Sequence, residues 1–340
     1  MTTAEPFAGF GGFRAACDQN GLQTVWGCEN DPYARRAYRH FWGEEPAGGD
    51  ITTEDTGGIP DHDILTGGFP CQPFSRAGVS KLISLGRGHG FADITKGTLF
   101  FDLCRILEAK HPSAFVFENV KNIRTHDKGR TMEVILSSLA DLGYYVRYRL
   151  IDASHWLPQH RERVYIVGFR DELGLEPMTA LWDIEIPPTR LAGLEDVLEP
   201  EPDPSYTLKN GVWELHLRHR ANSLAKGSSF GYGLIEPPFE GKITRTLLHR
   251  YYKDGAEILI AQPGKIPRTL TPLECLRLQG FPAHLEPGLY DSGLSNDRLY
   301  MGFGNAVPVP VASTVVGRVK RLLEGGGSMS ILPSFRNQVR

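Results

Sequence analysis

The sequence lacks several features that define common classes of protein. Its cysteines are odd in number and include no close Cys-x-x-Cys pair; they are Cys17, Cys28, Cys71, Cys104 and Cys275. This pattern argues against a disulfide framework and a zinc site, so we expect no metal, and it is typical of a reducing cytoplasm. There is no long apolar run and no signal peptide, so we expect no membrane span. The chain also lacks the lysine of a Walker motif, which argues against an ATP-hydrolysing site.

A strong net charge is absent as well. The 340 residues carry a formal net charge of −3, and 41% of them are hydrophobic. That is enough for one large domain, or for a large and a small domain together. The net value hides a local asymmetry, because eight Lys or Arg residues and only three Glu residues lie in the segment 205–253, a local charge of +5. Charge alone does not distinguish a nucleic-acid surface from a solvated one.

Strand-like and helix-like segments alternate over the first 170 residues. The chain opens as strand, glycine turn (7–13) and helix (14–20). The further strand-like runs are 24–28, 63–66, 114–117, 145–150 and 163–169, and the helix-like segments are 33–41, 98–109 and 132–142. This alternation predicts a mostly parallel sheet covered by helices on both faces, an α/β fold.

The amino-acid composition changes after residue 170. Prolines and acidic residues accumulate up to residue 203, which indicates a boundary. Beyond it, the segment 205–253 alternates irregularly, 268–280 reads as a helix, and a last helix covers 311–323. The glycines from residue 325 onward predict a flexible tail over 326–340.

Cys71 is the most informative single residue. It lies in the run Gly-Gly-Phe-Pro-Cys-Gln-Pro-Phe-Ser (67–75), directly after a strand-like segment. Most lone cysteines are small buried hydrophobes. A turn rich in Gly and Pro makes a poor core position, so we interpret the Cys71 thiol as a nucleophile.

Other polar residues gather at predicted strand ends. The glycine turn allows close backbone approach to a ligand, and Glu29 follows the second strand, where an acid binds ribose hydroxyls; together they indicate a nucleoside-type cofactor. Glu118 also follows a strand, and the carboxyl ends of strands in such a sheet converge on one crevice, so Glu118 and Cys71 are expected to share a site. A thiol with an acid suits covalent addition to a ring carbon and proton delivery to a ring nitrogen. Arg161 and Arg163 could supply guanidinium donors, although a charged surface loop is the commoner outcome for such a run.

These motifs, in this order, resemble the DNA (cytosine-5)-methyltransferase family. The matching runs are Phe-Ala-Gly-Phe-Gly-Gly (7–12), Glu-Asn-Asp (29–31), Asp-Ile-Leu (63–65), Gly-Phe-Pro-Cys-Gln (68–72), Glu-Asn-Val (118–120), Gln-x-Arg-x-Arg (159–163), Arg-x-Leu-Thr-x-x-Glu (268–274), Gln-Gly-Phe-Pro (279–282) and Gly-Asn-Ala-Val-Pro (304–308). The resemblance implies a Rossmann-like, AdoMet-dependent catalytic domain over 1–180 and 296–325. It implies a smaller target-recognition domain over 181–295, which contains the basic segment.

The resemblance also implies roles for individual residues. Cys71 corresponds to the nucleophile that adds to cytosine C6, Glu118 to the acid at N3, and Arg163 to the ligand of O2, with Arg161 beside it. The positions that match the pocket for S-adenosyl-L-methionine are Phe7, Gly9, Gly11, Gly12, Glu29, Asn30, Asp50, Ile51, Pro70, Leu99, Asn305 and Ala306. The segment 76–96 resembles the mobile loop that closes over a flipped base.

The expected substrate is double-stranded DNA. Stretches of 231–260 resemble the recognition region of the bacterial Dcm-like branch, which implies a CCWGG or CCNGG target. The candidate DNA-contacting residues there are Lys226, Lys242, Arg245, Arg250 and Lys253. We expect a cytoplasmic monomer of bacterial or phage origin, and the candidate protein partners are those of a restriction or defence system.

One departure from the family pattern concerns the first strand. The family has Asp-Leu before Phe-Ala-Gly, whereas this chain has Glu5 and Pro6 after only four residues. Proline has no N–H for a sheet ladder, so we expect a short or distorted first strand and a looser cofactor site.

Three other functions compete with this interpretation. An RNA cytosine-5 methyltransferase of the tRNA-modifying branch would have the same pocket, but the long basic segment favours DNA. An exocyclic-amino methyltransferase needs an Asp/Asn-Pro-Pro-Tyr/Phe loop, and Asp31-Pro32-Tyr33 lacks one proline and follows the wrong strand. A catalytically silent binding module is disfavoured by the intact set of Cys71, Glu118 and Arg163.

Overall fold

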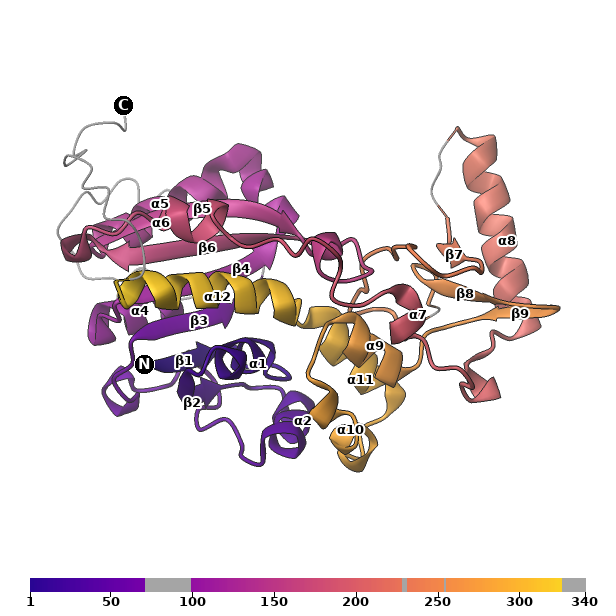
Figure 1. Ribbon diagram of the computed structural model, residues 1–340, viewed down its shortest axis with the longest axis horizontal. Helices are drawn as coiled ribbons and strands as arrows, with labels where there is room; N and C mark the ends of the chain where they lie inside the picture. The colour runs from indigo at the N-terminus through magenta and orange to yellow at the C-terminus, as the bar shows by residue number, and fades with distance from the viewer. Residues whose placement is uncertain (71–98, 228–230, 254, 326–340) are drawn as a thin grey trace.

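The chain forms two β-sheets with helices around them (Figure 1). The structure, a computed structural model, describes residues 1–70, 99–227, 231–253 and 255–325. The main sheet has the order β2-β1-β3-β4-β6-β5, and its strands are β1 (Thr2–Pro6), β2 (Gln23–Cys28), β3 (Ile64–Gly68), β4 (Ala114–Val120), β5 (Tyr144–Asp152) and β6 (Glu162–Arg170). The small sheet has the order β7-β8-β9, with β7 (Leu234–Ile235), β8 (Leu259–Gln262) and β9 (Lys265–Arg268).

The main sheet is mostly parallel, as the sequence predicts. The pairs β1–β2, β1–β3 and β3–β4 are parallel, whereas β6 runs antiparallel to both β4 and β5. The carboxyl ends of β1, β2, β3 and β4 therefore meet at one edge of the sheet, where ligands bind in folds of this type.

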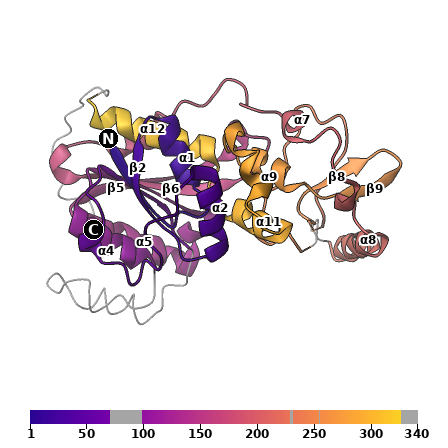
Figure 2. The ribbon, with the colours of Figure 1, turned by 90° about the horizontal axis from the view of Figure 1, so that it is seen from below.

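Helices cover both faces of the main sheet (Figure 2). One face carries α1 (Gly12–Gln19), α6 (Pro177–Trp182) and α12 (Val309–Leu323), and the other carries α4 (Leu99–Lys110) and α5 (Arg130–Asp141). Side chains of β4 point alternately to the two faces of the sheet. Ala114 and Val116 pack with the first group of helices, and Phe115 and Phe117 pack with the second. This pattern is typical of a strand that is buried on both faces.

The first strand is short, as expected from Pro6. It has five residues, and its register against β2 shifts between Thr3 and Ala4. Pro6 is the last residue of β1 and pairs only with Cys28 of β2, while β3 pairs with Thr3 and Ala4. The missing N–H of Pro6 thus falls at the strand end, where it interrupts no ladder.

The remaining helices lie around the small sheet, between the two sheets or beside the main sheet (Figure 1). They are α2 (Pro32–Trp42), α7 (Leu194–Val197), α8 (Asn210–Ala225), α9 (Pro272–Leu278), α10 (Gly288–Asp291) and α11 (Asn296–Asn305). Short 3-10 turns are η1 (Thr56–Gly58), η3 (Lys121–Arg124), η4 (His126–Gly129), η5 (Ala153–His155), η6 (Asp171–Leu173), η7 (Pro204–Tyr206) and η8 (Ala283–Leu285). An apolar cluster with Phe10 and Phe41 on one side and Leu270 and Phe303 on the other joins the two parts.

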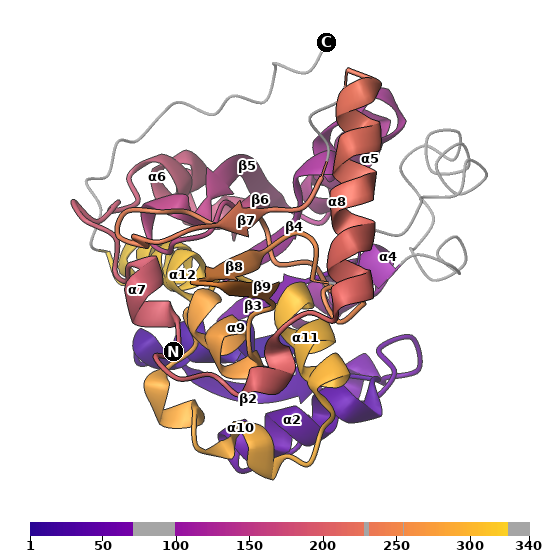
Figure 3. The same ribbon diagram turned by 90° about the vertical axis from the view of Figure 1, so that its right-hand side faces the viewer.

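One predicted helix is shorter than expected, and one helix was not predicted. The helix expected over 268–280 begins only at Pro272, because Thr271 caps it in a reciprocal capping box with Glu274 and Arg268 belongs to β9. Within the irregular segment 205–253 lies α8, a helix of sixteen residues whose one buried residue is His216. Figure 3 shows α8 projecting beyond the small sheet.

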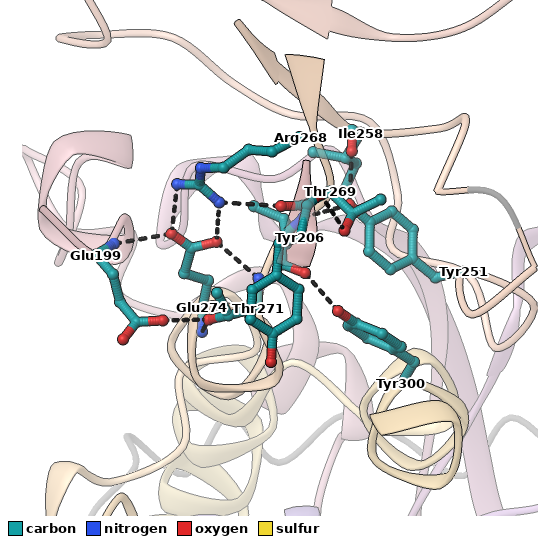
Figure 4. Close-up of polar contacts among 10 residues, drawn as sticks. Glu199, Tyr206, Tyr251, Ile258, Arg268, Thr269, Thr271, Glu274 and Tyr300 are labelled. Carbon is teal, nitrogen blue, oxygen red and sulfur yellow. Dashed lines mark hydrogen bonds and ion pairs between the residues drawn. The ribbon is translucent and has the colours of Figure 1, made fainter. Parts of the chain in front are cut away.

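A buried polar cluster connects β9, α9 and α11 (Figure 4). The carboxylate of Glu274, which is fully buried, accepts two hydrogen bonds from the Arg268 guanidinium, at 2.7 and 2.8 Å. It also accepts the backbone N–H groups of Thr271 and Glu199, both at 2.8 Å. Tyr300 donates its hydroxyl to the carbonyl of Leu270, so α11, α9 and the strand β9 are held together.

One helical stretch, Asn296–Leu323, is long and apolar enough to span a membrane by length and composition. It combines α11 and α12, and 67% of its most apolar window is buried inside the protein. It is therefore a core element of this fold.

Candidate active site

A cavity of about 600 Å³ lies at the carboxyl edge of the main sheet. Its lining comes from the turn after β1, the ends of β2, β3 and β4, and the segment 298–307. Ten of the twelve predicted cofactor residues line it: Phe7, Gly9, Gly12, Glu29, Asn30, Ile51, Pro70, Leu99, Asn305 and Ala306. Glu118 and Arg163 line the same cavity, so two of the four predicted catalytic residues lie beside these predicted cofactor residues.

Gly11 and Asp50 lie outside the cavity lining, and the structure shows why. Gly11 has φ +82°, and a Cβ built on it would come within 2.1 Å of the Trp42 indole nitrogen. Its glycine is therefore required by packing against α2, behind the turn. The Asp50 carboxylate is exposed and accepts hydrogen bonds from the amide and hydroxyl of Thr52, which lower its pKa. Its two neighbours, Gly49 and Ile51, do line the cavity.

Glu29 is held in a defined orientation at the end of β2. Its Oε2 accepts the N–H of Gly9 at 2.8 Å, and its Oε1 accepts the N–H of Asp31 at 2.8 Å. The carboxylate thus ties the glycine turn to the start of α2, whose N-cap is Asp31. Each oxygen keeps a second lone pair for a ligand hydroxyl.

Glu5 is a lining residue that sequence reasoning missed. Its Oε1 accepts the N–H groups of Phe13 and Arg14, at 3.1 and 3.2 Å, in the first turn of α1. Its Oε2 is buried and has no hydrogen-bond partner among the described residues. Burial raises the pKa of Glu5 to about 8, against the lowering effect of its bonds to Arg14 and Phe13. The sequence did contain a sign of this role, because Glu5 stands where the family has an aspartate.

Glu118 and Arg163 form the polar floor of the cavity. They lie on the neighbouring antiparallel strands β4 and β6, and Arg163 Nε is 2.7 Å from Glu118 Oε1. Glu118 is 7% exposed, and its burial raises its pKa, while the charges of Arg163 and Arg161 oppose the rise. Burial therefore favours the protonated form of this carboxyl group, which is the form that can deliver a proton to a ring nitrogen.

Cys71 and the segment 76–96 lie outside the described residues, but the chain leading to them is fixed. Gly68 pairs with Glu118 in the β3–β4 register, and the Asn119 side chain donates to the carbonyl of Phe69 at 2.9 Å. Pro70 lines the cavity. The other four cysteines are free and buried, and burial raises the pKa of each of their thiols. None of those four has the environment of a reactive thiolate.

Arg161 lies behind the cavity. Its side chain is fully buried and donates to the backbone carbonyls of Leu247, Gly304 and Ala306, at 2.8, 2.9 and 2.7 Å. Burial, together with the nearby charge of Arg163, lowers its pKa to about 9. It does not line the cavity, so its predicted catalytic role stays a prediction, and its contacts are those of a positioning residue.

The predicted DNA-contacting residues do not line the main cavity. Arg245, Arg250, Lys226 and Lys253 are exposed, and Lys242 bonds the carbonyl of Glu236. A second cavity of about 310 Å³ adjoins the first through Val120 and Arg163, and Thr246 and Leu248 line it. The main cavity is also lined by residues that no sequence signal indicated: Tyr33, His249, Arg298 and Met301.

Together, the site combines an anchored carboxylate, a glycine turn and a buried Glu–Arg pair in one cavity. The mostly parallel sheet with this cavity at its carboxyl edge is the architecture of a methyltransferase. The sequence model of the family described as C-5 cytosine-specific DNA methylase matches residues 1–321. The chain belongs to this family, and its enzyme class is DNA-cytosine methyltransferase.

Individual relatives agree with this assignment. The chain is 44% identical over 324 residues to the type II methyltransferase M.NlaX of Neisseria lactamica, covering 93% of this chain and 95% of that one. It is 41% identical to a DNA-cytosine methyltransferase of Escherichia coli, covering 91% and 75%. The S. pombe Dnmt2 methyltransferase structure superimposes with a TM-score of 0.74 over 95% of this chain and 99% of that one. Its identity is 19%, so this likeness shows the fold alone.

Proposed function

We propose that this enzyme transfers a methyl group from S-adenosyl-L-methionine to C5 of a cytosine within a specific duplex DNA site. The observation that carries the proposal is the Glu118–Arg163 pair at the floor of the same cavity that Glu29 and the glycine turn line. The 41–44% identity to DNA-cytosine methyltransferases favours DNA over the tRNA alternative.

The chemistry of the cavity suits S-adenosyl-L-methionine, which supplies an electrophilic methyl group on a sulfonium centre. The anchored carboxylate of Glu29 can accept the ribose hydroxyls. The unpartnered Oε2 of Glu5 leaves a buried polar atom in the lining that can hydrogen-bond to a ligand. Ile51 and Leu99 supply apolar walls for an adenine ring. The S-adenosyl-L-homocysteine product lacks the sulfonium charge, so its attraction to the Glu29 carboxylate is weaker.

We propose covalent catalysis by Cys71. Its thiolate adds to C6 of the cytosine while Glu118 protonates N3 and Arg163 donates to O2, which makes C5 nucleophilic enough to take the methyl group. Loss of the C5 proton to water then expels the thiolate, and the N3 proton returns to Glu118, which restores the aromatic ring. Arg163 holds the Glu118 carboxyl at 2.7 Å, so the acid is oriented before the base arrives.

The base must leave the duplex to reach this floor. Flipping it out costs on the order of a few kcal/mol, which contacts in the pocket and to the backbone offset. We propose that the residues 181–295 choose the sequence and that 1–180 with 296–325 carry the chemistry. A Dcm-like CCWGG or CCNGG target follows from the resemblance of the recognition region. Arg245, Arg250 and Lys253 are then candidates for base contacts, and Lys226 and Lys242 for phosphate contacts.

The cellular setting follows from the relatives' names. Type II methyltransferases among them suggest a restriction-modification system, and we propose the same defence context, in the cytoplasm, for this monomeric enzyme.

Two variants test the mechanism. Cys71→Ser should abolish methyl transfer to duplex DNA while cofactor binding persists, since a hydroxyl without a base is a weak nucleophile. Glu118→Gln should lower kcat strongly with little change in DNA affinity, because proton delivery acts in the transition state. A duplex with 5-fluorocytosine at the target should form a stable adduct at Cys71, detectable by mass spectrometry. Substantial turnover by the Cys71→Ser enzyme, or efficient methylation of tRNA in place of DNA, would contradict the proposal.

A further inference from the structure

The contacts of Arg161 join two segments that serve different ligands. Leu247, its first acceptor, belongs to the segment 244–249, which contains Arg245 and His249. Gly304 and Ala306, its other acceptors, flank Asn305 in the lining of the main cavity. One planar guanidinium therefore bridges the proposed DNA-recognition segment and the proposed cofactor pocket.

The segment 244–249 is also held by hydrogen bonds to the residues just before β6. Gln159 is fully buried, and its side chain accepts the N–H of Leu247 at 2.9 Å and donates to the carbonyl of Leu278 at 3.1 Å. Thr244 is hydrogen-bonded to the backbone of Pro158 and His160, at 2.8 and 2.9 Å. The segment is thus fastened along residues 158–161, directly before β6.

A second observation, independent of these hydrogen bonds, brings the same two segments together. A Cβ built on Gly304 would lie 2.4 Å from the backbone nitrogen of His249 and 2.4 Å from the backbone carbonyl carbon of Leu248. The two backbones are therefore in direct contact, and only glycine allows that approach. A shift of 247–249 toward 304–306 therefore requires those residues to move as well.

We propose that Arg161 is a positioning residue that couples DNA binding to cofactor binding in this enzyme. A duplex that orders the segment 244–249 also fixes the Leu247 carbonyl, and through Arg161 it fixes the carbonyls on both sides of Asn305. By thermodynamic linkage, the cofactor must strengthen DNA binding by the same factor. The inference rests on the proposed function, because it needs DNA on that segment and the cofactor in the cavity.

The test measures the dissociation constant of S-adenosyl-L-homocysteine with and without a saturating duplex that the wild-type enzyme methylates. The wild-type ratio of the two constants should be at least about fivefold, within the usual range of such couplings. In Arg161→Lys the ratio should fall to about one, because a single ammonium cannot reach three carbonyls as the planar guanidinium does. Arg149→Lys is the matched control: Arg149 donates to the Leu181 carbonyl at 2.6 Å, away from both segments, and its ratio should equal that of the wild type.

Hydrogen exchange on the wild-type enzyme supplies a readout that does not depend on the variant's folding. Adding the duplex should slow exchange of the amides of 303–307, and adding S-adenosyl-L-homocysteine should slow exchange of those of 244–248. A wild-type ratio near one with both ligands bound, or an unchanged ratio in a folded Arg161→Lys enzyme, would overturn the inference. If either ligand failed to bind at all, the proposed function itself would be contradicted.

Discussion

The buried pair of Arg268 and Glu274 gives a prediction whose size follows from the structure. In Glu274→Gln, one carboxylate oxygen becomes an NH2 group. Each oxygen of Glu274 accepts hydrogen bonds from two N–H groups. In either orientation of the glutamine amide, its NH2 group therefore points at two N–H donors and loses both hydrogen bonds. Two lost charge-assisted hydrogen bonds cost about 3–6 kcal/mol, which agrees with about 3–5 kcal/mol for breaking a buried pair.

Thermal unfolding measures this loss. For a chain of 340 residues, the unfolding entropy of about 2.1 cal/mol/K per residue converts it to a drop in Tm on the order of 5 °C. The matched control is Glu286→Gln, since Arg277 and Glu286 also form a bidentate pair, at 2.8 and 2.9 Å, but are about a quarter exposed. That change should cost about 0–1 kcal/mol. Equal shifts in Tm for the two variants would refute the argument that burial sets the size of the effect.

Four further changes give smaller or more specific results. Because burial raises the pKa of Glu5 from 4.5 to about 8, the stability contributed by its protonated form is complete below about pH 4.5 and is lost as the pH rises through about 8. Glu5→Gln, which stays neutral, should therefore unfold at a higher Tm than the wild type at pH 9 and show a smaller advantage at pH 6; a constant difference would contradict this. Glu29→Ala should weaken binding of S-adenosyl-L-methionine about ten- to a hundredfold in calorimetry, and unchanged affinity would remove Glu29 from the site. Arg245→Ala should cost about 1–3 kcal/mol and relax one position of the target, whereas Lys226→Ala should weaken binding to all sequences and lower the salt slope by about 1. Binding titrations at several salt concentrations separate those two outcomes, and identical behaviour of the two variants would argue against the division of roles.

Much of the main sheet could be predicted from the sequence because its signals are local. Short apolar runs between glycine and proline turns mark its strands, and the segments expected at 114–117 and 163–169 lie inside β4 and β6. The presence of Glu29 and Glu118 in one cavity followed from the convergence of strand ends, and the presence of Arg163 there followed from the family resemblance.

The features that were not predicted depend on tertiary contacts. The helix α8 has no apolar stripe, since it buries only His216, so periodicity gave no sign of it. The three carbonyl acceptors of Arg161 lie 86 to 145 residues away in sequence, and no local pattern could distinguish this buried arginine from its neighbour Arg163 in the cavity. Gly11 and Asp50 matched the family pattern, but the packing of Trp42 and the turn at Thr52 decide where they lie.

Nucleoside analysis by mass spectrometry tests the central claim most directly. Purified enzyme is incubated with cytosine-containing duplex DNA and S-adenosyl-L-methionine carrying a deuterated methyl group, and the DNA is then digested to nucleosides. The account predicts labelled 5-methyl-deoxycytidine, no product from the Cys71→Ser enzyme, and sites that share one sequence when the same DNA is read after bisulfite treatment. Label on N4 of cytosine or on adenine, or no label in duplex DNA with an active preparation, would contradict it.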